Sequence, residues 1–250
     1  MSPFRSTIVF GALVVASAAS SSLAGAQDAG NGFLFGAPTG SLTIRGGWAV
    51  ASAKSDLFAF TTEQLTLNRR DFSSPSGDAD LAFFVTPRTQ IVASVSFART
   101  SKRSEFRDYL DNNDLPIEQN TTFARVPITV GVKRYLTAPG RSIGKFAWIP
   151  SRVAPYVGIG GGTMYYRFRQ AGDFIDYKTF DVFASQFSSD GWAATAHAQA
   201  GADYSLNARF ALTGEARYVW SKATLSHDFS GFENLDLSGF STSAGIAVRF

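Results

Sequence analysis

Apolar and polar residues alternate with a period of two along most of the chain after residue 40. In the final segment, 237–250, one face carries most of the large apolar side chains, namely Phe240, Ile246, Val248 and Phe250. The other face carries mainly small residues and an arginine. Successive side chains of a β-strand point to opposite faces, so the pattern predicts a strand with one face in an apolar environment.

The same alternation recurs in earlier segments, which are separated by stretches rich in Asp, Asn, Ser, Gly and Pro. The predicted strands are 41–52, 78–86, 89–99, 123–136, 154–167, 191–205, 209–222 and 237–250. Most of them are long enough to cross a bilayer at a tilt, which takes about 9 to 11 residues. The segments "DLFAFTTEQLTL" and "FDVFASQF" leave ten strands as an alternative to eight.

The connections between these strands alternate in length. Only "TPRT" and "SLNAR" join the second strand to the third and the sixth to the seventh, whereas the intervening connections are much longer. Short turns on one side and long loops on the other are typical of outer-membrane barrels, whose long loops are extracellular. The connection 137–153 is an exception, because it is long but falls on the predicted periplasmic side, and no role for it follows from the sequence.

Aromatic residues lie near the strand ends, with smaller apolar residues between them. In the sixth predicted strand, for example, alanines alternate with polar residues between Trp192 and Tyr204. Girdles of aromatic residues around an apolar band are expected where strands cross lipid. The sequence therefore predicts an all-β fold, a single antiparallel transmembrane β-barrel of eight strands with long extracellular loops.

The N-terminus has the features of an export signal. Residues 1–26 contain one arginine, a short apolar run and a final Ala-Gly-Ala, which predicts a signal peptide that is removed on export. We expect a short periplasmic segment over 27–40 and the barrel over 41–250. The chain has no cysteine, so its stability does not depend on disulfides. Its net charge of +3 is too small to indicate a nucleic-acid partner.

The sequence also resembles a known family. The ending "TSAGIAVRF" looks like the C-terminal assembly signal of bacterial outer-membrane proteins, in which Phe250, Val248 and Ile246 would be read by the barrel-insertion machinery. The stretches "APYVGIGGGTMYY" and "ARFALTGEARYVW" resemble the small OmpA-, OmpX- and OmpW-like barrels. The resemblance implies location in the bacterial outer membrane, but no single activity, because the family is functionally diverse.

Three motifs suggest chemistry and are better explained otherwise. "GIGGGTMYY" lacks the Lys-Ser/Thr of a phosphate loop, and its glycines leave room for bulky side chains in a narrow lumen. Ser226, His227 and Asp228 are adjacent, and adjacent residues rarely face one another as a catalytic group must. "DYLDNNDLP" lacks the glycine and glutamate of a calcium-binding EF-hand loop. We therefore expect no enzyme activity, cofactor or metal.

Inward-facing charges predict a polar lumen. Eight strands enclose space that side chains fill, and charges removed from water are costly unless they are paired. The expected lumen cluster comprises Glu215, Arg217, His197, Gln199, Arg45 and Arg249, with Lys133 as a further cation. The short "SLNAR" turn predicts that Glu215 lies opposite His197 or Gln199, and that Asp203 lies near Arg209.

Two other groups of residues suggest ligands. Arg99, Lys102 and Arg103 lie near the predicted outer interface, where they would meet the phosphates of lipopolysaccharide unless they form an ordinary solvated cluster. The outer loops are unusually rich in phenylalanine, including Phe58, Phe60, Phe174, Phe180 and Phe183, with Leu57 and Phe187 beside them. These side chains would either roof a binding pocket or pack loop against loop.

Two functions remain open at this point. The first is a structural or receptor-like role that acts through the long outer loops. The second is an OmpW-like conduit or binding protein for small hydrophobic molecules. Outer-membrane lipid and lipopolysaccharide, and the insertion machinery, are expected partners of either.

Overall fold

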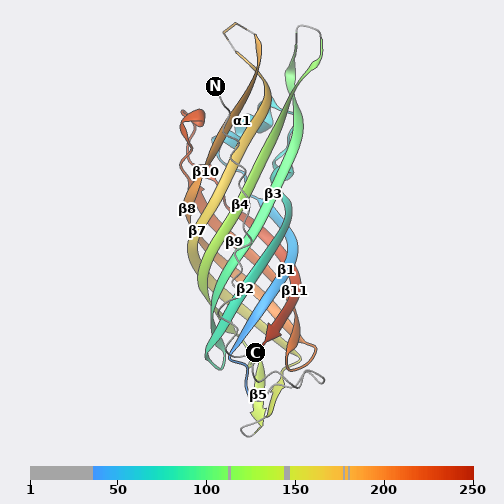
Figure 1. Ribbon diagram of the computed structural model, residues 1–250, viewed down its shortest axis with the longest axis vertical. Coiled ribbons are helices and arrows are strands. Elements are labelled where there is room, and N and C mark those ends of the chain that lie inside the picture. The colour runs from blue at the N-terminus through green and yellow to red at the C-terminus, as the bar shows by residue number, and fades with distance from the viewer. Residues whose placement is uncertain (1–35, 112–113, 144–146, 177, 180) are drawn as a thin grey trace, which may run out of the picture.

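The computed structural model describes residues 36–111, 114–143, 147–176, 178–179 and 181–250. The predicted signal peptide and most of the predicted periplasmic segment 27–40 lie outside these residues. Eight long strands form the body of the molecule (Figure 1). They are β1 (Gly40–Ala51), β2 (Ser74–Thr86), β3 (Thr89–Leu110), β4 (Pro116–Tyr135), β7 (Val153–Ile175), β8 (Val182–Ser205), β9 (Phe210–Ala223) and β11 (Gly239–Arg249).

These strands close into a barrel. Each is antiparallel to the next, β9 also pairs with β11, and β11 pairs with β1, so that the last strand joins the first. The predicted eight-stranded antiparallel barrel is confirmed, and the ten-stranded alternative is wrong. The segment "DLFAFTTEQLTL" does not form a hairpin, because most of it is the helix α1 (Asp56–Gln64). The described part of "FDVFASQF" is the beginning of β8.

The apolar face of the strands points out of the barrel. Large side chains remain exposed there on every wall, including Ile44, Trp48, Phe97, Val130, Ile159, Trp192, Trp220 and Ile246. The intervening residues point inward, and many of them are buried and charged or polar. Closure pairs the strand edges that hydrocarbon could not solvate. Among the described residues, no helix is both long and apolar enough to cross a membrane.

Four strands are much longer than predicted. β3 and β4 remain paired as far as Glu105 and Glu118 and, after a shift in register, pair again at Leu110 and Pro116, while β7 and β8 remain paired as far as Ile175 and Val182. These extensions form two tall hairpins beyond the outer end of the barrel (Figure 1). The alternation that predicts strands is lost in the extensions because polar residues lie on both of their faces, including buried inward ones such as Ser104, Gln119 and Gln170.

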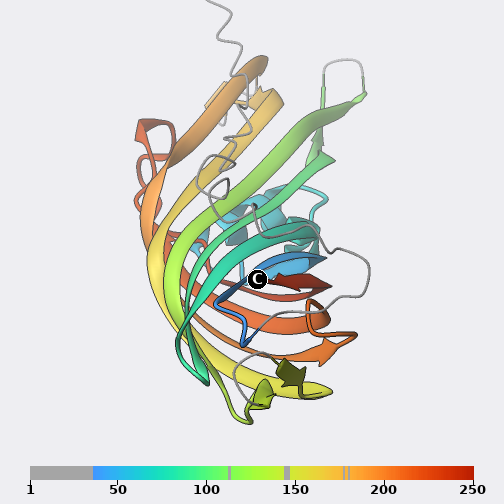
Figure 2. The ribbon, with the colours of Figure 1, turned by 60° about the horizontal axis from the view of Figure 1, so that its bottom comes forward.

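The other two outer connections fold inward. The first contains α1 and a 3₁₀ turn, η2 (Arg69–Phe72), and the last contains η3 (His227–Phe229) and β10 (Leu235–Asp236). The strands curve around the segment that carries α1, as Figure 2 shows. The helix buries Leu57, Phe58 and Thr61. These connections therefore fill the outer mouth of the barrel.

The long periplasmic connection is a small hairpin of β5 (Gly140–Ile143) and β6 (Ala147–Pro150), which extends below the barrel (Figure 1). Its Trp148 is buried, with the Arg249 guanidinium carbon 5.5 Å from the ring centroid. Arg249 belongs to the closing strand, so the contact joins the hairpin to the barrel.

The predicted register between β8 and β9 is wrong. Glu215 lies opposite Gly201, and Asp203 lies opposite Thr213. The reason is the conformation of the turn, in which the Asn207 side-chain oxygen accepts hydrogen bonds from the backbone N–H groups of Arg209 and Phe210, at 2.9 and 2.7 Å. These bonds hold Arg209 in the turn, so Asp203 faces Thr213, four residues beyond Arg209 along the chain.

Candidate functional site: the barrel lumen

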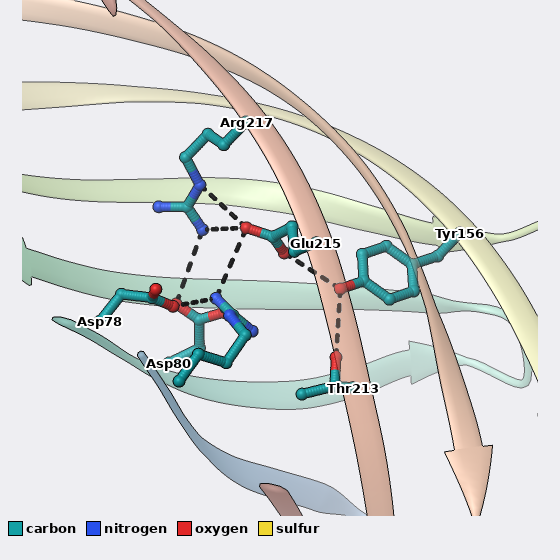
Figure 3. Close-up of polar contacts among 7 residues, drawn as sticks. Asp78, Asp80, Tyr156, Thr213, Glu215 and Arg217 are labelled. Carbon is teal, nitrogen blue, oxygen red and sulfur yellow. Dashed lines mark hydrogen bonds and ion pairs between the residues drawn. The ribbon is translucent and has the colours of Figure 1, made fainter. Parts of the chain in front are cut away.

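The lumen contains an ionic cluster built by strands that are distant in the sequence (Figure 3). It is composed of Arg45 on β1, Asp78 and Asp80 on β2, and Glu215 and Arg217 on β9. Arg45 Nη2 lies 2.6 Å from Asp80 Oδ2 and also pairs with Asp78. Arg217 Nη2 lies 2.9 Å from Glu215 Oε1, which is 3.5 Å from Arg45 Nη2. One carboxylate oxygen thus joins the two arginines.

Further side chains complete the cluster. The Tyr156 hydroxyl donates to Glu215 Oε2 at 3.1 Å and lies 3.4 Å from Thr213 Oγ1. Lys133 is within electrostatic range of Asp80 and Glu215. The three cations Arg45, Lys133 and Arg217 balance the three carboxylates, and this pairing offsets the cost of removing all six charges from water.

Not all of the predicted cluster gathers around Glu215. His197 and Gln199 are buried and face inward, and Gln199 lies opposite Arg217; His197 lies opposite Val219 but is within electrostatic range of Arg217 and Asp80. Arg249 lies farther along the barrel, where its Nη1 donates to Ser205 Oγ at 2.9 Å. Asp78 and Asp80 belong to the cluster but were not predicted from the sequence. Their spacing of two on β2 places both on the inward face, which is the signal that could have identified them.

A second polar group lies toward the periplasmic end. The Tyr135 hydroxyl donates to Asp203 Oδ2 at 2.6 Å. Lys133 Nζ lies 5.1 Å from the centroid of the Tyr135 ring and 4.6 Å from that of Tyr156. Asp203 is therefore held by a tyrosine two strands away on β4, and not by Arg209 as predicted.

The outer half of the lumen is filled by an apolar plug. Phe58 of α1 is fully buried at its centre, and its ring centroid lies 4.7, 5.3 and 5.7 Å from those of Phe72, Phe123 and Phe168. The remaining buried members of the plug are Ala51, Ala53, Leu57, Leu65, Leu67, Met164, Tyr166, Ala193, Ala223, Phe229, Leu235 and Leu237. Side chains from two outer connections thus pack against the inward face of the wall.

The other predicted loop phenylalanines are divided between two places. Phe60 is 42% exposed and pairs with Phe232 at 5.4 Å between ring centroids. Phe174 and Phe183 contact each other in the β7–β8 hairpin, where Phe187 lies 4.7 Å from Phe174. Phe180 lies outside the described residues. Of the predicted residues that the structure describes, Phe58 and Leu57 are therefore buried in the plug, and Phe187 packs against it.

A small cavity lies between the apolar plug and the ionic cluster. Met164 and Val219 line it on the plug side, and Asp78, Glu215 and Arg217 on the cluster side. The rest of its lining consists largely of small residues: Ala49, Ser76, Ser96, Ala98, Gly239, Ser241 and Ser243, together with Phe97, Arg125, Pro127 and Phe240. The cavity thus offers an apolar end and a charged end.

The barrel wall beside this cavity has a break in its strand pairing, which we call the β3–β4 seam. β3 and β4 pair at Val95 with Ile128 and again at Ala98 with Arg125, but the residues between, 96–97 and 126–127, are not paired with each other. Residue 127 is a proline, which has no N–H to donate. On its other side it still pairs with Met164 of β7. The break is therefore confined to one seam.

Arg125 lies next to the seam and points inward. Its Nη1 donates to the carbonyl oxygens of Leu237 and Ser238, at 3.0 and 3.3 Å. Its guanidinium carbon lies 5.3 Å from the centroid of the Phe123 ring. Arg125 thus links the seam to the last outer connection across the lumen.

The residues of the predicted assembly signal lie on the outer face of the closing strand. Phe250 accepts hydrogen bonds at its carbonyl oxygen from the N–H groups of Thr39 and Gly40, at 2.7 and 3.0 Å, and its ring contacts Phe83. Val248 and Ile246 pair with Leu42 and Ile44 of β1. Recognition by the insertion machinery stays a prediction.

Ser226, His227 and Asp228 make structural contacts in the last outer connection. Ser226 Oγ donates to the Ser188 carbonyl oxygen at 2.8 Å, and Asp228 Oδ2 accepts from the Ser188 N–H at 3.0 Å. All three residues are exposed. Their contacts fasten this connection to the backbone of β8.

The predicted lipopolysaccharide residues do not share one face. Arg99 and Arg103 lie an even number of residues from Phe97 on β3, so they share its lipid-facing side. Lys102 lies an odd number of residues away and points to the other side of the strand. Its Nζ lies 4.0 Å from Asp71 Oδ1 of the first outer connection. A hydrogen bond to Glu118 raises the pKa of Arg103, so its guanidinium stays charged. Lys102 therefore does not belong with the two arginines.

The closed ring, the apolar outer band and the buried charges together decide the class of protein. Only lipid suits such an outer surface, and only a closed sheet leaves no unpaired edge in lipid. The chain is a small transmembrane β-barrel of eight strands. This architecture agrees with the outer-membrane location that the resemblance in its C-terminal strand implies.

Comparison with known proteins gives matches among solved structures only. No protein-family model and no curated protein matches the chain. The outer membrane protein OprG from Pseudomonas aeruginosa is 16% identical, with a TM-score of 0.46, over 86% of this chain and 98% of that one. Ail from Yersinia pestis, solved with the heparin analogue sucrose octasulfate, is 14% identical, with a TM-score of 0.42, over 85% and 99%. Neisserial surface protein A is 12% identical, with a TM-score of 0.42, over 84% and 96%.

Proposed function

We propose that this barrel is a non-enzymatic binding protein or conduit for small hydrophobic molecules, which pass between the lumen cavity and the membrane through the β3–β4 seam. The observation that carries the proposal is the coincidence of cavity and seam. Ser96, Phe97 and Pro127 line the cavity, and the same residues lie where the two strands are not paired.

The chemistry of the seam supports this role. Backbone groups that are unpaired in hydrocarbon cost several kcal/mol each, so a wall within lipid is normally paired throughout. Pro127 keeps the seam from pairing by removing a donor. Strands that lack mutual hydrogen bonds separate at lower cost than the paired strands on either side.

The shape of the lumen favours a lateral route over an axial one. The apolar plug closes the outer half, and the ionic cluster closes the half toward the periplasm. A molecule in the cavity would have its apolar part near Met164 and Val219 and a polar group near Arg217. The proposed ligand is therefore small and mainly apolar, with a polar end.

The test is a reversible lock on the seam. Phe97→Cys/Val126→Cys places two cysteines opposite each other in a chain that has no others, so a disulfide would close the seam. The probe is N-phenyl-1-naphthylamine, which fluoresces in apolar surroundings, added to the purified barrel in phosphatidylcholine vesicles. We expect oxidation to remove the protein-dependent fluorescence and reduction to restore it.

Two controls separate closure from damage. Val95→Cys/Ile128→Cys locks a position that is already paired and should leave binding unchanged. Pro127→Val restores an N–H without a disulfide and should weaken binding in the same direction as the lock. Equal fluorescence from the locked and the reduced seam would contradict the proposal.

The tall hairpins favour a second candidate, the structural or receptor-like role. Their pairing extends to Leu110 on β3 and to Ile175 on β7, which presents two rigid surfaces outside the membrane. Binding of the probe that does not respond to the seam lock would leave this role as the better explanation.

A further inference from the structure

The strand register aligns arginines from two strands just outside an aromatic row. Val126 pairs with Tyr165, and Tyr165 pairs with Trp192, while Phe97 precedes Arg99 by two residues on β3. The next set outward along the strands is Arg99, Ala124, Arg167 and Asp190, each paired with its neighbour. Beyond it comes Ser101, Thr122, Arg169 and Ser188, and then Arg103, Asn120, Ala171 and Gln186.

We call Arg99, Arg103, Arg167 and Arg169 the arginine face. On both strands they have the parity of lipid-facing residues such as Phe97 and Ile159. Their neighbours of opposite parity, for example Thr100 and Phe168, are buried inside the barrel. The arginine face therefore points outward, away from the lumen and its cavity.

Side chains between the arginines hold them in place and leave polar groups exposed. Arg167 Nη2 donates to the Tyr165 hydroxyl at 2.8 Å, and that hydroxyl donates to Asp190 at 3.2 Å. Arg169 contacts Gln186, and Arg103 pairs with Glu118. Glu105, which pairs with Glu118 across β3 and β4, also lies near Arg103, so four arginines face three carboxylates and the surface carries a net charge of +1.

The surface between the arginines is hollowed and rich in hydroxyl and amide groups. A depression there is lined by Ser101, Arg103, Glu118, Gln119, Asn120 and Ala171. Ser101 Oγ lies 3.0 Å from both Asn120 Oδ1 and Thr122 Oγ1. Such groups suit sugar hydroxyls, whereas guanidinium groups suit phosphate oxygens, to which they donate two parallel hydrogen bonds.

We propose that the arginine face binds the phosphates of the lipid A part of lipopolysaccharide in the outer leaflet. Aromatic residues mark the boundary of the hydrocarbon, so cations two residues beyond them lie at the depth of lipid headgroups. Lipid A carries phosphates on sugars at that depth, and its acyl chains would lie along the apolar wall below. A soluble sulfated polysaccharide would need the cations but not the adjoining apolar wall.

The experiment measures the binding of purified lipid A to the full barrel in neutral detergent micelles by calorimetry. Diphosphoryl lipid A should bind at least about tenfold more tightly than lipid A from which both phosphates have been removed, as expected for charge-assisted hydrogen bonds. Arg167→Gln/Arg169→Gln should lose about tenfold in affinity for the diphosphoryl form. The matched control, Arg88→Gln/Arg134→Gln, removes two exposed arginines near the opposite rim and should change the affinity less than about twofold.

A gain in affinity provides a second, independent test. Glu118 forms an ion pair with Arg103. Glu118→Gln should therefore free the Arg103 guanidinium and strengthen the binding of diphosphoryl lipid A by about threefold. Misfolding cannot produce such a gain. Equal affinity for the phosphorylated and stripped lipids would overturn the proposal. The proposal would also be overturned if Arg167→Gln/Arg169→Gln lost binding of heparin, a soluble sulfated polysaccharide, while its binding of lipid A stayed unchanged.

Discussion

At the scale of single residues, Glu215 shows how the lumen accommodates buried charge. Both of its oxygens are used, one by Arg217 and Arg45 and the other by Tyr156. Without it, Arg217 Nη2 would have Asp80 Oδ1 at 3.7 Å as its remaining carboxylate contact. The cluster would then hold three buried cations and two carboxylates. This excess of one positive charge would destabilise the folded state.

Glu215→Ala should therefore destabilise the barrel strongly. Removing one partner of a buried ion pair typically costs about 3 to 5 kcal/mol. Glu63→Ala, in the exposed part of α1, is the control and should shift stability by less than about 0.5 kcal/mol. The measurement is the urea midpoint of the barrel refolded into phosphatidylcholine vesicles. Equal midpoints for the two variants would show that Glu215 is not held in a closed polar network.

At the scale of elements, α1 matters because it inserts an apolar side chain into the mouth of a barrel. Its sequence, "DLFAFTTEQ", contains two phenylalanines that the structure treats differently. Phe58 lies at the centre of the plug, whereas Phe60 contacts only the rim through Phe232. The periplasmic hairpin is attached in a comparable way, by Trp148 against Arg249.

The two phenylalanines allow a matched test of the plug. Phe58→Ala should cost about 3 to 5 kcal/mol, because it opens a cavity in a packed cluster. Phe60→Ala should cost less than about 1.5 kcal/mol, because its ring is already 42% exposed. Hydrogen exchange of the α1 amides would reveal where the loss falls, with faster exchange expected in the Phe58 variant only. Similar exchange in both variants would argue against the plug as the anchor of α1.

At the scale of the whole molecule, the barrel is closed to ions along its axis and weakened at one place in its wall. The ionic cluster and the apolar plug are successive barriers, and eight strands leave little space beyond what side chains fill. The β3–β4 seam, the cavity and the arginine face all involve the wall around β3 and β4. The proposed functions therefore share these strands but use opposite faces of them.

This arrangement predicts little steady conductance in planar lipid bilayers. The barrel should show no long-lived open steps at moderate voltage, whereas a general porin measured in the same bilayer should. Lateral exchange through the seam needs no continuous water-filled path, so low conductance is compatible with uptake of the hydrophobic probe. Large, stable conductance steps would contradict both barriers.

The sequence by itself determined the fold class and the outward orientation of the apolar residues, and it favoured eight strands over ten. Each of these follows from period-two alternation, which reflects the local geometry of a strand and needs no knowledge of its partners. The alternation of short and long connections likewise placed the two ends of the barrel. The lumen charges Arg45, Glu215 and Arg217 could be assigned to the inside for the same reason.

Only the tertiary structure decided which residues meet. Register depends on the conformation of each turn, and the bonds made by Asn207 moved Glu215 away from His197 and Gln199. The hairpin extensions have no apolar face to mark them, and the helix α1 owes its place to packing against Phe123 and Phe168. The seam at Pro127 and the meeting of Arg99 with Arg167 across β4 arise from pairing between strands. A single sequence shows which way a side chain points along its own strand, whereas its neighbours are set by the closure of the whole sheet.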